Sequence, residues 1–178
     1  MQQKENNQLP EKIYLIGPMG SGKSTIGYKL AKSLNYSYID LDHEIEKTTG
    51  AKIALIFELE KEEGFRKRES QELNKTLDKR KVIVATGGGV ILLEENRLFL
   101  KEHGFNIYLN ANVNTIYKRV KNKKTRPLLE VENPKNEIEK ILLQRKNKYE
   151  EVANFQINTD NKNAKSIVNE ILNQLKKS

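Results

Sequence analysis

The chain has 178 residues, 37% of them hydrophobic and none of them cysteine, which suits one domain with its own core and excludes disulfides, cysteine nucleophiles and thiolate metal sites. Its formal net charge is +8, but the basic residues are spread among acidic ones and no basic run is interleaved with aromatic residues, so we expect a surface that attracts small anions and no nucleic-acid partner. No run of about 18 apolar residues could cross a membrane, and the N-terminus has no apolar core of a signal peptide, so we expect a cytoplasmic protein without a membrane partner.

The first expected elements are a tail, a strand and a helix. Residues 1–12 are polar, with Pro10 near their end, and predict a flexible N-terminal tail. The apolar run at 13–16 predicts a buried strand, and apolar residues at helical spacing predict a helix over 23–34. The chain from 13 to 178 is expected to form a single domain.

A phosphate-binding loop lies between this strand and this helix. The sequence Gly17-x4-Gly22-Lys23-Ser24 matches the P-loop pattern G-x-x-x-x-G-K-[ST], in the strand–loop–helix context that the motif requires. Its glycines let successive backbone N–H groups face one anion, and the helix N-terminus adds positive charge. Lys23 would bind the β- and γ-phosphates of a nucleotide, and Ser24 would ligate Mg²⁺, a cation that takes oxygen ligands. The residues expected to bind the nucleotide here are Gly20, Ser21, Gly22, Lys23, Ser24 and Thr25.

The next stretch predicts one strand followed by three helices. The strand, 36–39, ends in Asp40-Leu41-Asp42, so two carboxylates follow it. The helices are expected at 44–49, 53–62 and 65–79, and Gly50 would end the first of them. The third is expected to carry Phe65, Leu73, Thr76 and Leu77 on one face.

The second half of the chain alternates strands and helices around one irregular segment. A continuous apolar strand over 82–86 stops at Gly87-Gly88-Gly89, where the backbone can approach a ligand closely. Residues 121–134 are polar and break the helical pattern, and we expect a mobile lid there. The other expected elements are helices at 94–103, 113–121, 135–152 and 164–175, and strands at 106–109 and 155–159.

Strands that alternate with helices predict an α/β fold: a five-stranded parallel sheet with helices on both faces, in three layers. Ligands of such sheets bind at the carboxyl ends of the strands. That edge would gather the P-loop, Asp40, Asp42 and the glycines at 87–89, which lie far apart in the sequence.

The residues expected at this edge indicate that an acceptor substrate binds there as well as a nucleotide. Asp42 can accept a hydrogen bond from an alcohol, and glycine N–H groups can pass close to a ring. The arginines at 66, 126 and 145 can bind a carboxylate in bidentate fashion, so an anionic polyol is the expected acceptor. Taken singly each signal is weak, because an Asp after a strand often caps a helix and an arginine on a helix is usually solvated.

The motifs in their order resemble those of one family over nearly the whole chain, from Ile13 to about Leu175. They are Gly17 to Gly27, Asp40-Leu41-Asp42 with Ile45-Glu46, Phe65-Arg66-x-x-Glu69, Ala85 to Gly89, Asn96-Arg97, and Arg126-Pro127-Leu128-Leu129. Together they resemble the shikimate kinase family, whose P-loop fold is like that of nucleoside monophosphate kinases. The resemblance implies Mg²⁺-dependent transfer of the ATP γ-phosphoryl group to the 3-hydroxyl of shikimate, in the biosynthesis of aromatic amino acids. ATP and shikimate are then the expected partners, and we expect a monomer.

The resemblance also implies a role for each residue of the acceptor site. Asp42 would bind the shikimate hydroxyls and act as the base. Arg66 and Arg145 would clamp the carboxylate. Gly88 and Gly89 would form the backbone wall of the pocket, and helices within about 43–80 would enclose it.

On the nucleotide side the resemblance places the metal and the remaining charges. Ser24 and Asp40 match the Mg²⁺ side, Asp40 through water. Arg119 matches an arginine beside adenine, and Arg126 matches a lid arginine that reaches the phosphates. Phosphoryl transfer depends on positioning and charge neutralisation, so Lys23 and Arg126 would be catalytic together with the base.

The sequence departs from the family pattern at three places, and we expect these departures to affect loop shape and ligand binding rather than the reaction. Lys61 stands where a Gly before Glu is usual upstream of Phe65. Lys146-Asn147-Lys148-Tyr149 replaces an Arg-x-Pro-Leu-Tyr continuation after Arg145, and Ala164 stands where a proline near adenine is common.

Two alternatives share part of these motifs. A kinase for gluconate or a nucleotide has the P-loop and the lid, but lacks the pairing of Phe65-Arg66-x-x-Glu69 with the glycine triplet. A GTPase switch needs a base-reading Asn-Lys-x-Asp, and the nearest stretch, residues 122–125, ends in Thr.

Overall fold

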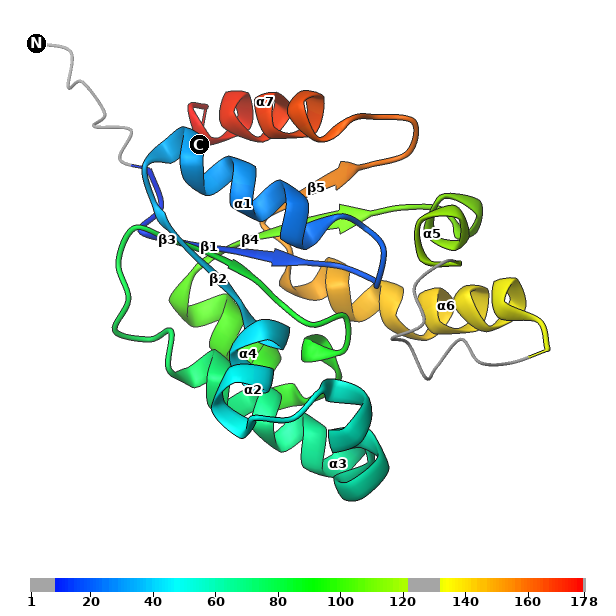
Figure 1. The fold of residues 1–178 in the computed structure, drawn as a ribbon. Coiled ribbons are helices and arrows are strands. Elements are labelled where there is room, and N and C mark those ends of the chain that lie inside the picture. The colour runs from blue at the N-terminus through cyan, green and yellow to red at the C-terminus, as the bar shows by residue number, and fades with distance from the viewer. Residues whose placement is uncertain (1–8, 122–131, 178) are drawn as a thin grey trace, which may run out of the picture.

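The computed structural model describes residues 9–121 and 132–177, and within them the chain forms a five-stranded parallel sheet in the order β2-β3-β1-β4-β5 (Figure 1). The strands are β1 (Lys12–Ile16), β2 (Ser37–Asp40), β3 (Val82–Ala85), β4 (Phe105–Asn110) and β5 (Phe155–Asn158). The helices are α1 (Lys23–Leu34), α2 (Leu41–Thr49), α3 (Ile53–Asn74), α4 (Glu94–His103), α5 (Val113–Val120), α6 (Pro134–Val152) and α7 (Ala164–Leu175), with a 3₁₀ turn at Val90–Leu92. The α/β fold class with a parallel five-stranded sheet is thus confirmed.

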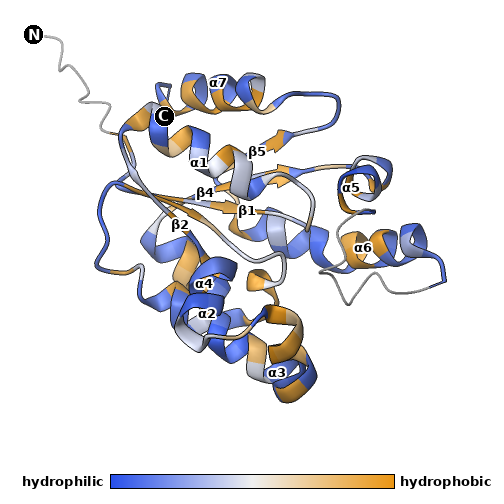
Figure 2. Ribbon diagram, in the orientation of Figure 1, coloured by the Kyte–Doolittle hydropathy of each residue, from blue (hydrophilic) through white to orange (hydrophobic). Residues whose placement is uncertain are grey.

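Helices cover both faces of the sheet, and the alternation within β1 shows how. Ile13 and Leu15 pack with α1 and α7 on one face, whereas Tyr14 and Ile16 pack with α3, α4 and α6 on the other. The three central strands, β1, β3 and β4, are buried along nearly their whole length, and Figure 2 shows the apolar character of β1. The edge strands β2 and β5 keep exposed residues. Because β1 lies at the centre, the loop that follows it opens in the middle of the carboxyl edge of the sheet.

Several boundaries differ from those the sequence predicts. The strand expected from 13 begins at Lys12, whose backbone pairs with β3, so β1 reaches into the segment expected as a tail. The helix expected from 44 begins at Leu41, because the Asp40 carboxylate accepts from the backbone N–H of His43 and caps it. The helix expected to reach 79 ends at Asn74, and Leu77 lies outside it, 43% exposed.

Lys61 divides α3 into two helical parts. Its φ of 60° and ψ of −172° lie in a region that is almost exclusive to glycine. Across this kink the Arg68 guanidinium donates to both carboxylate oxygens of Glu60, at 2.7 and 2.6 Å. The sequence predicted two helices that are separated near residue 62. The structure has one helix with a kink at Lys61, where the family usually has Gly.

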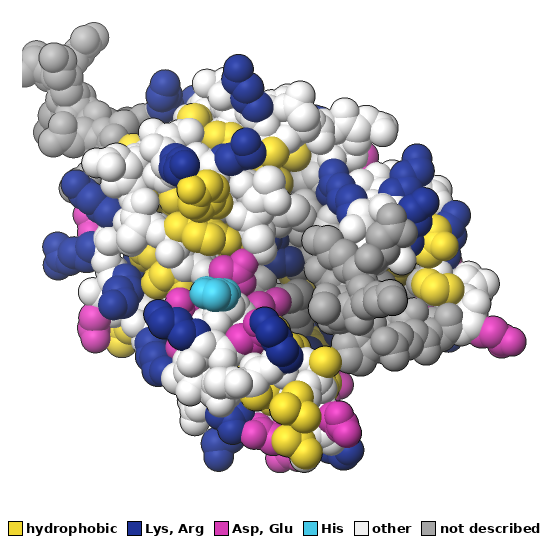
Figure 3. All heavy atoms as spheres, viewed as in Figure 1, with side chains coloured by type: hydrophobic (Ala, Val, Ile, Leu, Met, Phe, Trp, Pro, Cys, Tyr) yellow, Lys and Arg dark blue, Asp and Glu magenta, His cyan; other side chains and the backbone are white. Residues whose placement is uncertain are grey.

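The surface matches the expected mixture of charges. On the face shown in Figure 3, basic side chains are distributed over the whole surface, with acidic side chains between them around α2 and α3. None of the helices within 9–121 and 132–177 is both long and apolar enough to cross a membrane.

Candidate active site

The phosphate loop between β1 and α1 has the backbone that its glycines allow. Gly17, Gly20 and Gly22 have φ values of 142°, 74° and 100°, which side chains other than glycine rarely adopt. A Cβ at Gly17 would also lie 2.3 Å from the carbonyl oxygen of Leu109, so the loop begins in close contact with the neighbouring strand β4. The Lys23 ammonium donates to the carbonyl oxygens of Gly17 and Pro18, at 2.8 and 2.9 Å, and so lies across the loop.

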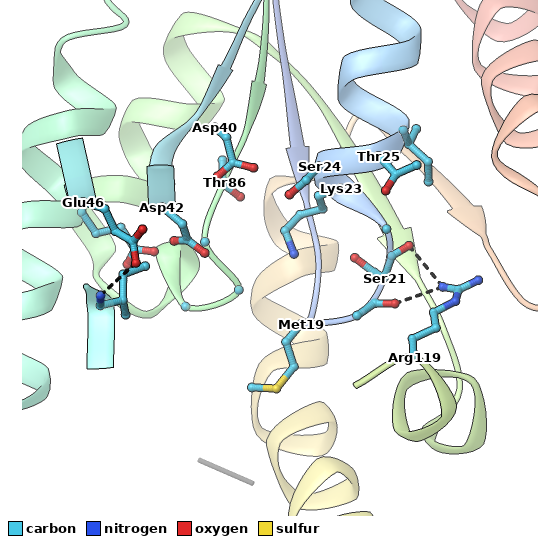
Figure 4. A pocket seen from close by; sticks show the side chains of 18 of the residues that line it. Met19, Ser21, Lys23, Ser24, Thr25, Asp40, Asp42, Glu46, Thr86 and Arg119 are labelled. Carbon is cyan, nitrogen blue, oxygen red and sulfur yellow. Dashed lines mark hydrogen bonds between the residues drawn. The ribbon is translucent and has the colours of Figure 1, made fainter. Parts of the chain in front are cut away.

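Arg119 of α5 fixes the outer side of this loop. Its Nη1 donates to the carbonyl oxygen of Gly20 at 3.0 Å (Figure 4). Its Nη2 donates to the carbonyl oxygen of Thr159, after β5, at 2.9 Å. Arg119 and Ala164, the first residue of α7, both line the cavity. The expected neighbour of adenine is therefore also a brace between the phosphate loop and the segment that leads into α7.

The two residues expected on the metal side lie together. Asp40 ends β2 and Ser24 lies in the first turn of α1, and Figure 4 shows their side chains pointing toward one another. The hydroxyl of Tyr38 joins them, since it lies 3.1 Å from Asp40 Oδ2 and 3.2 Å from the Ser24 carbonyl oxygen. Within the described residues no three His, Cys, Asp or Glu side chains gather into a metal cluster, so a cation here would draw its other ligands from phosphate oxygens and water.

Asp42 lies in the first turn of α2, two residues after Asp40, and lines the cavity. In Figure 4 its carboxylate and the Lys23 ammonium face one another across the gap between α2 and the phosphate loop. An acceptor hydroxyl bound to Asp42 would thus lie on the side of the loop where a γ-phosphoryl group is held.

The arginines of the expected carboxylate clamp are buried rather than solvated. Arg66 and Arg145 are each 8% exposed, although they lie on helices α3 and α6. Arg145 donates to the carbonyl oxygen of Gly88 at 3.1 Å. The Arg66 guanidinium donates to Glu69 Oε2 at 2.6 Å and lies so close to Gly89 that a Cβ there would be 2.3 Å from its Cζ.

Glu69 is the main residue of the site that the sequence did not assign. It is 0% exposed, and its Oε1 has no hydrogen-bond partner among the described residues. Burial raises the pKa of Glu69 to about 7, against the opposing pull of Arg66, and the charge of Asp42 adds to the rise. A Cβ at Gly87 would lie 2.1 Å from Oε1, so the glycine triplet makes room for this carboxyl. The spacing Arg66-x-x-Glu69 was the available signal, since residues i and i+3 of a helix share a face.

Tyr149 of α6 contacts the glycine triplet. Its hydroxyl donates to the carbonyl oxygen of Gly88, and its ring stacks on Tyr108 of β4 at 4.9 Å between centroids. Helix α6 continues through Lys146-Asn147-Lys148 without interruption, so Arg145 and Tyr149 lie one helical turn apart. The missing proline of the family pattern therefore leaves both contacts to Gly88 in place.

One cavity of about 840 Å³ joins these groups. The expected residues that line it are Gly20, Ser21, Gly22, Lys23, Ser24, Thr25, Asp40, Asp42, Arg66, Gly88, Gly89, Arg119 and Arg145. Arg126 and most of the expected lid over 121–134 lie outside the described residues.

Comparisons with known proteins agree on one family. A family model described as shikimate kinase matches residues 19–176. Shikimate kinase of Haemophilus influenzae is 46% identical over 161 residues, which cover 90% of this chain and 89% of that protein, and shikimate kinase 1 of Erwinia tasmaniensis is 43% identical over 93% of this chain and 96% of its own length. The solved structure of shikimate kinase from Acinetobacter baumannii in complex with shikimate superposes with a TM-score of 0.90, at 44% identity over 93% of this chain and 92% of that one.

Proposed function

The chain belongs to the shikimate kinase family and is an ATP-dependent kinase that acts on shikimate; from that premise we propose that it works with Mg²⁺ and with the residues that line this cavity. The observation that carries the proposal is that Asp42, the phosphate loop and the two buried arginines all line one cavity. The reaction needs an acceptor hydroxyl, a phosphoryl group and a carboxylate clamp in one cavity, and the cavity supplies a group for each.

The nucleotide would bind along the phosphate loop. The backbone from Gly20 to Thr25 would hold the phosphates at the N-terminus of α1, and Lys23 would leave its carbonyl partners to reach the β- and γ-phosphates. Ser21 fits this role, because its buried Oγ has no hydrogen-bond partner among the described residues. Arg119 would border the adenine.

Ser24 and Asp40 would hold Mg²⁺, the latter through water. One hydroxyl and one carboxylate beside a phosphate site are a donor set that suits this cation, which keeps several waters and shares phosphate oxygens. When bound, Mg²⁺ neutralises charge on the phosphates.

Shikimate would bind between α2, α3 and α6. Arg66 and Arg145 would grip its carboxylate, and the backbone of Gly88 and Gly89 would lie against its ring. Asp42 would accept the proton of the 3-hydroxyl as that oxygen attacks the γ-phosphorus and the bond to the β-phosphate oxygen breaks. From its sequence motif we assign Arg126 to the phosphates.

Two substitutions separate the acceptor side from the phosphate side. Asp42→Asn should lower kcat by at least about 100-fold with ADP affinity within about twofold of the parent, because we assign Asp42 to the acceptor hydroxyl and not to the nucleotide. Lys23→Met should weaken ADP binding and lower kcat together. Steady-state kinetics and titration calorimetry measure the two quantities, and near-normal kcat in Asp42→Asn would remove Asp42 as the base.

A further inference from the structure

We propose that Tyr38 is a positioning residue for the divalent cation: its hydroxyl holds the Asp40 carboxylate in a fixed place relative to Ser24. The inference rests on the proposed function, because it takes Asp40 and Ser24 as the metal side. Tyr38 itself is not among the residues that line the cavity, so it would act through the two that are.

The hydroxyl of Tyr38 contacts both elements that carry the proposed ligands. It lies 3.1 Å from Asp40 Oδ2 at the end of β2 and 3.2 Å from the carbonyl oxygen of Ser24 in the first turn of α1. The other carboxylate oxygen of Asp40 accepts from the N–H of His43 at 3.4 Å and caps α2. Each oxygen of the Asp40 carboxylate is thus held by a hydrogen bond. The Tyr38 hydroxyl, which holds one of them, also contacts Ser24, the residue that would supply the other metal ligand.

The ring of Tyr38 is held in place by its neighbours on α1. A Cβ at Gly27 would lie 2.9 Å from Tyr38 Cε2, so the ring packs directly on the backbone of α1 where only glycine leaves space. Tyr28, one residue on, meets the ring edge to face at 5.9 Å between centroids. Because the ring is fixed in this way, the Tyr38 hydroxyl has little freedom to move. It therefore holds the end of β2 at a defined distance from the first turn of α1.

A single phenol proton serves two acceptors here. A phenol hydroxyl carries one proton, which it can donate to only one of its two neighbouring acceptors at a time. The proton can point at the Asp40 carboxylate or, when that oxygen is engaged by a water of the cation, at the Ser24 carbonyl. In either state the hydroxyl keeps a hydrogen bond, so Asp40 can engage the cation without leaving a polar group unpaired. Groups that orient ligand carboxylates in this way contribute strongly to metal affinity.

Tyr38→Phe removes the hydroxyl and keeps the ring, and Tyr28→Phe is the matched control, since Tyr28 touches the same ring at the surface. ADP affinity is measured by calorimetry in EDTA and over a series of Mg²⁺ concentrations. Tyr38→Phe should bind ADP within about twofold of the parent in EDTA but need about 10-fold more Mg²⁺ for the metal-dependent gain in affinity. Tyr28→Phe should follow the parent in both conditions.

The Asp40→Asn background shows whether the effect runs through the carboxylate. There, Tyr38→Phe should add less than about twofold to the Mg²⁺ requirement. A Tyr38→Phe protein with the Mg²⁺ requirement of the parent, or one that loses ADP affinity equally in EDTA, overturns the positioning role and leaves the proposed function intact. A parent whose ADP affinity does not change with Mg²⁺ would instead overturn the metal assignment on which the inference rests.

Discussion

Gly89→Ala should weaken shikimate binding by displacing a side chain that already occupies the space of the new methyl group. Gly89 has a φ of −107°, which alanine adopts without strain, so the backbone can keep its course. The added Cβ would lie 2.3 Å from Cζ and Nη1 of Arg66 and 2.4 Å from Nη2, whereas ordinary contacts begin at 3.4 Å. The guanidinium must therefore move by about 1 Å or more, away from the wall where the carboxylate would bind.

The size of the effect follows from the interaction that is lost. A hydrogen bond to a charged group contributes about 1.5–3 kcal/mol, which corresponds to about 10- to 100-fold in affinity. The KM for shikimate should rise by that factor, while the KM for ATP stays within about twofold, because the phosphate loop is not touched. A coupled assay of ADP release, with each substrate varied in turn, gives both constants.

Arg66→Met supplies the control, because it keeps the apolar stem and removes the guanidinium. If Gly89→Ala acts through Arg66, it should add less than about twofold to the KM for shikimate in the Arg66→Met background. An unchanged KM in Gly89→Ala alone would refute the assignment of Arg66 to the clamp. The full increase in both backgrounds would show that the methyl group blocks shikimate directly.

Two further predictions concern stability. Lys61→Gly should raise the free energy of unfolding by about 1 kcal/mol, because relief of a backbone conformation that costs about 1–3 kcal/mol outweighs the added chain entropy of glycine. As the control, Lys67→Gly, at an exposed position with helical geometry on α3, should lower the free energy of unfolding by about 1 kcal/mol. Urea denaturation measures both, and a destabilised Lys61→Gly protein would contradict the account of the kink. The raised pKa of Glu69 means that the folded protein binds this proton more tightly than the unfolded chain, so the stabilisation is full below the ordinary value of 4.5 and is lost as the pH rises toward about 7. The stability of the parent relative to Glu69→Gln should therefore fall between pH 4.5 and 7, and an advantage that grows with pH would show that the ion pair with Arg66 dominates.

The sequence was most informative where a backbone pattern and a ligand chemistry coincide. The P-loop was predictable because its glycines, Lys23 and Ser24 are fixed in both type and spacing, and the apolar runs of β1 and β3 are typical of strands buried on both faces. The edge of the sheet at which Asp40 and Asp42 lie followed from the parallel arrangement.

The parts that the sequence did not predict depend on tertiary contacts. Glu69 is charged and on a helix, so its complete burial follows only from the packing of Arg66 and the glycine triplet around it. The contact of the Tyr38 hydroxyl with Ser24 depends on the packing of α1 beside β2, which the sequence does not show. Lys61 adopts a glycine conformation that no propensity assigns to lysine, and only the surrounding structure imposes it.

The most direct test of the account is the release of ADP from MgATP by the purified protein with different acceptors. We propose that Asp42, Arg66 and Arg145, which line the cavity, bind an anionic polyol, so the rate should rise strongly on addition of shikimate and change little with gluconate or AMP. Equal rates with all three acceptors, or a rate that none of them raises, would contradict the claim that this cavity joins the phosphate loop to a shikimate site.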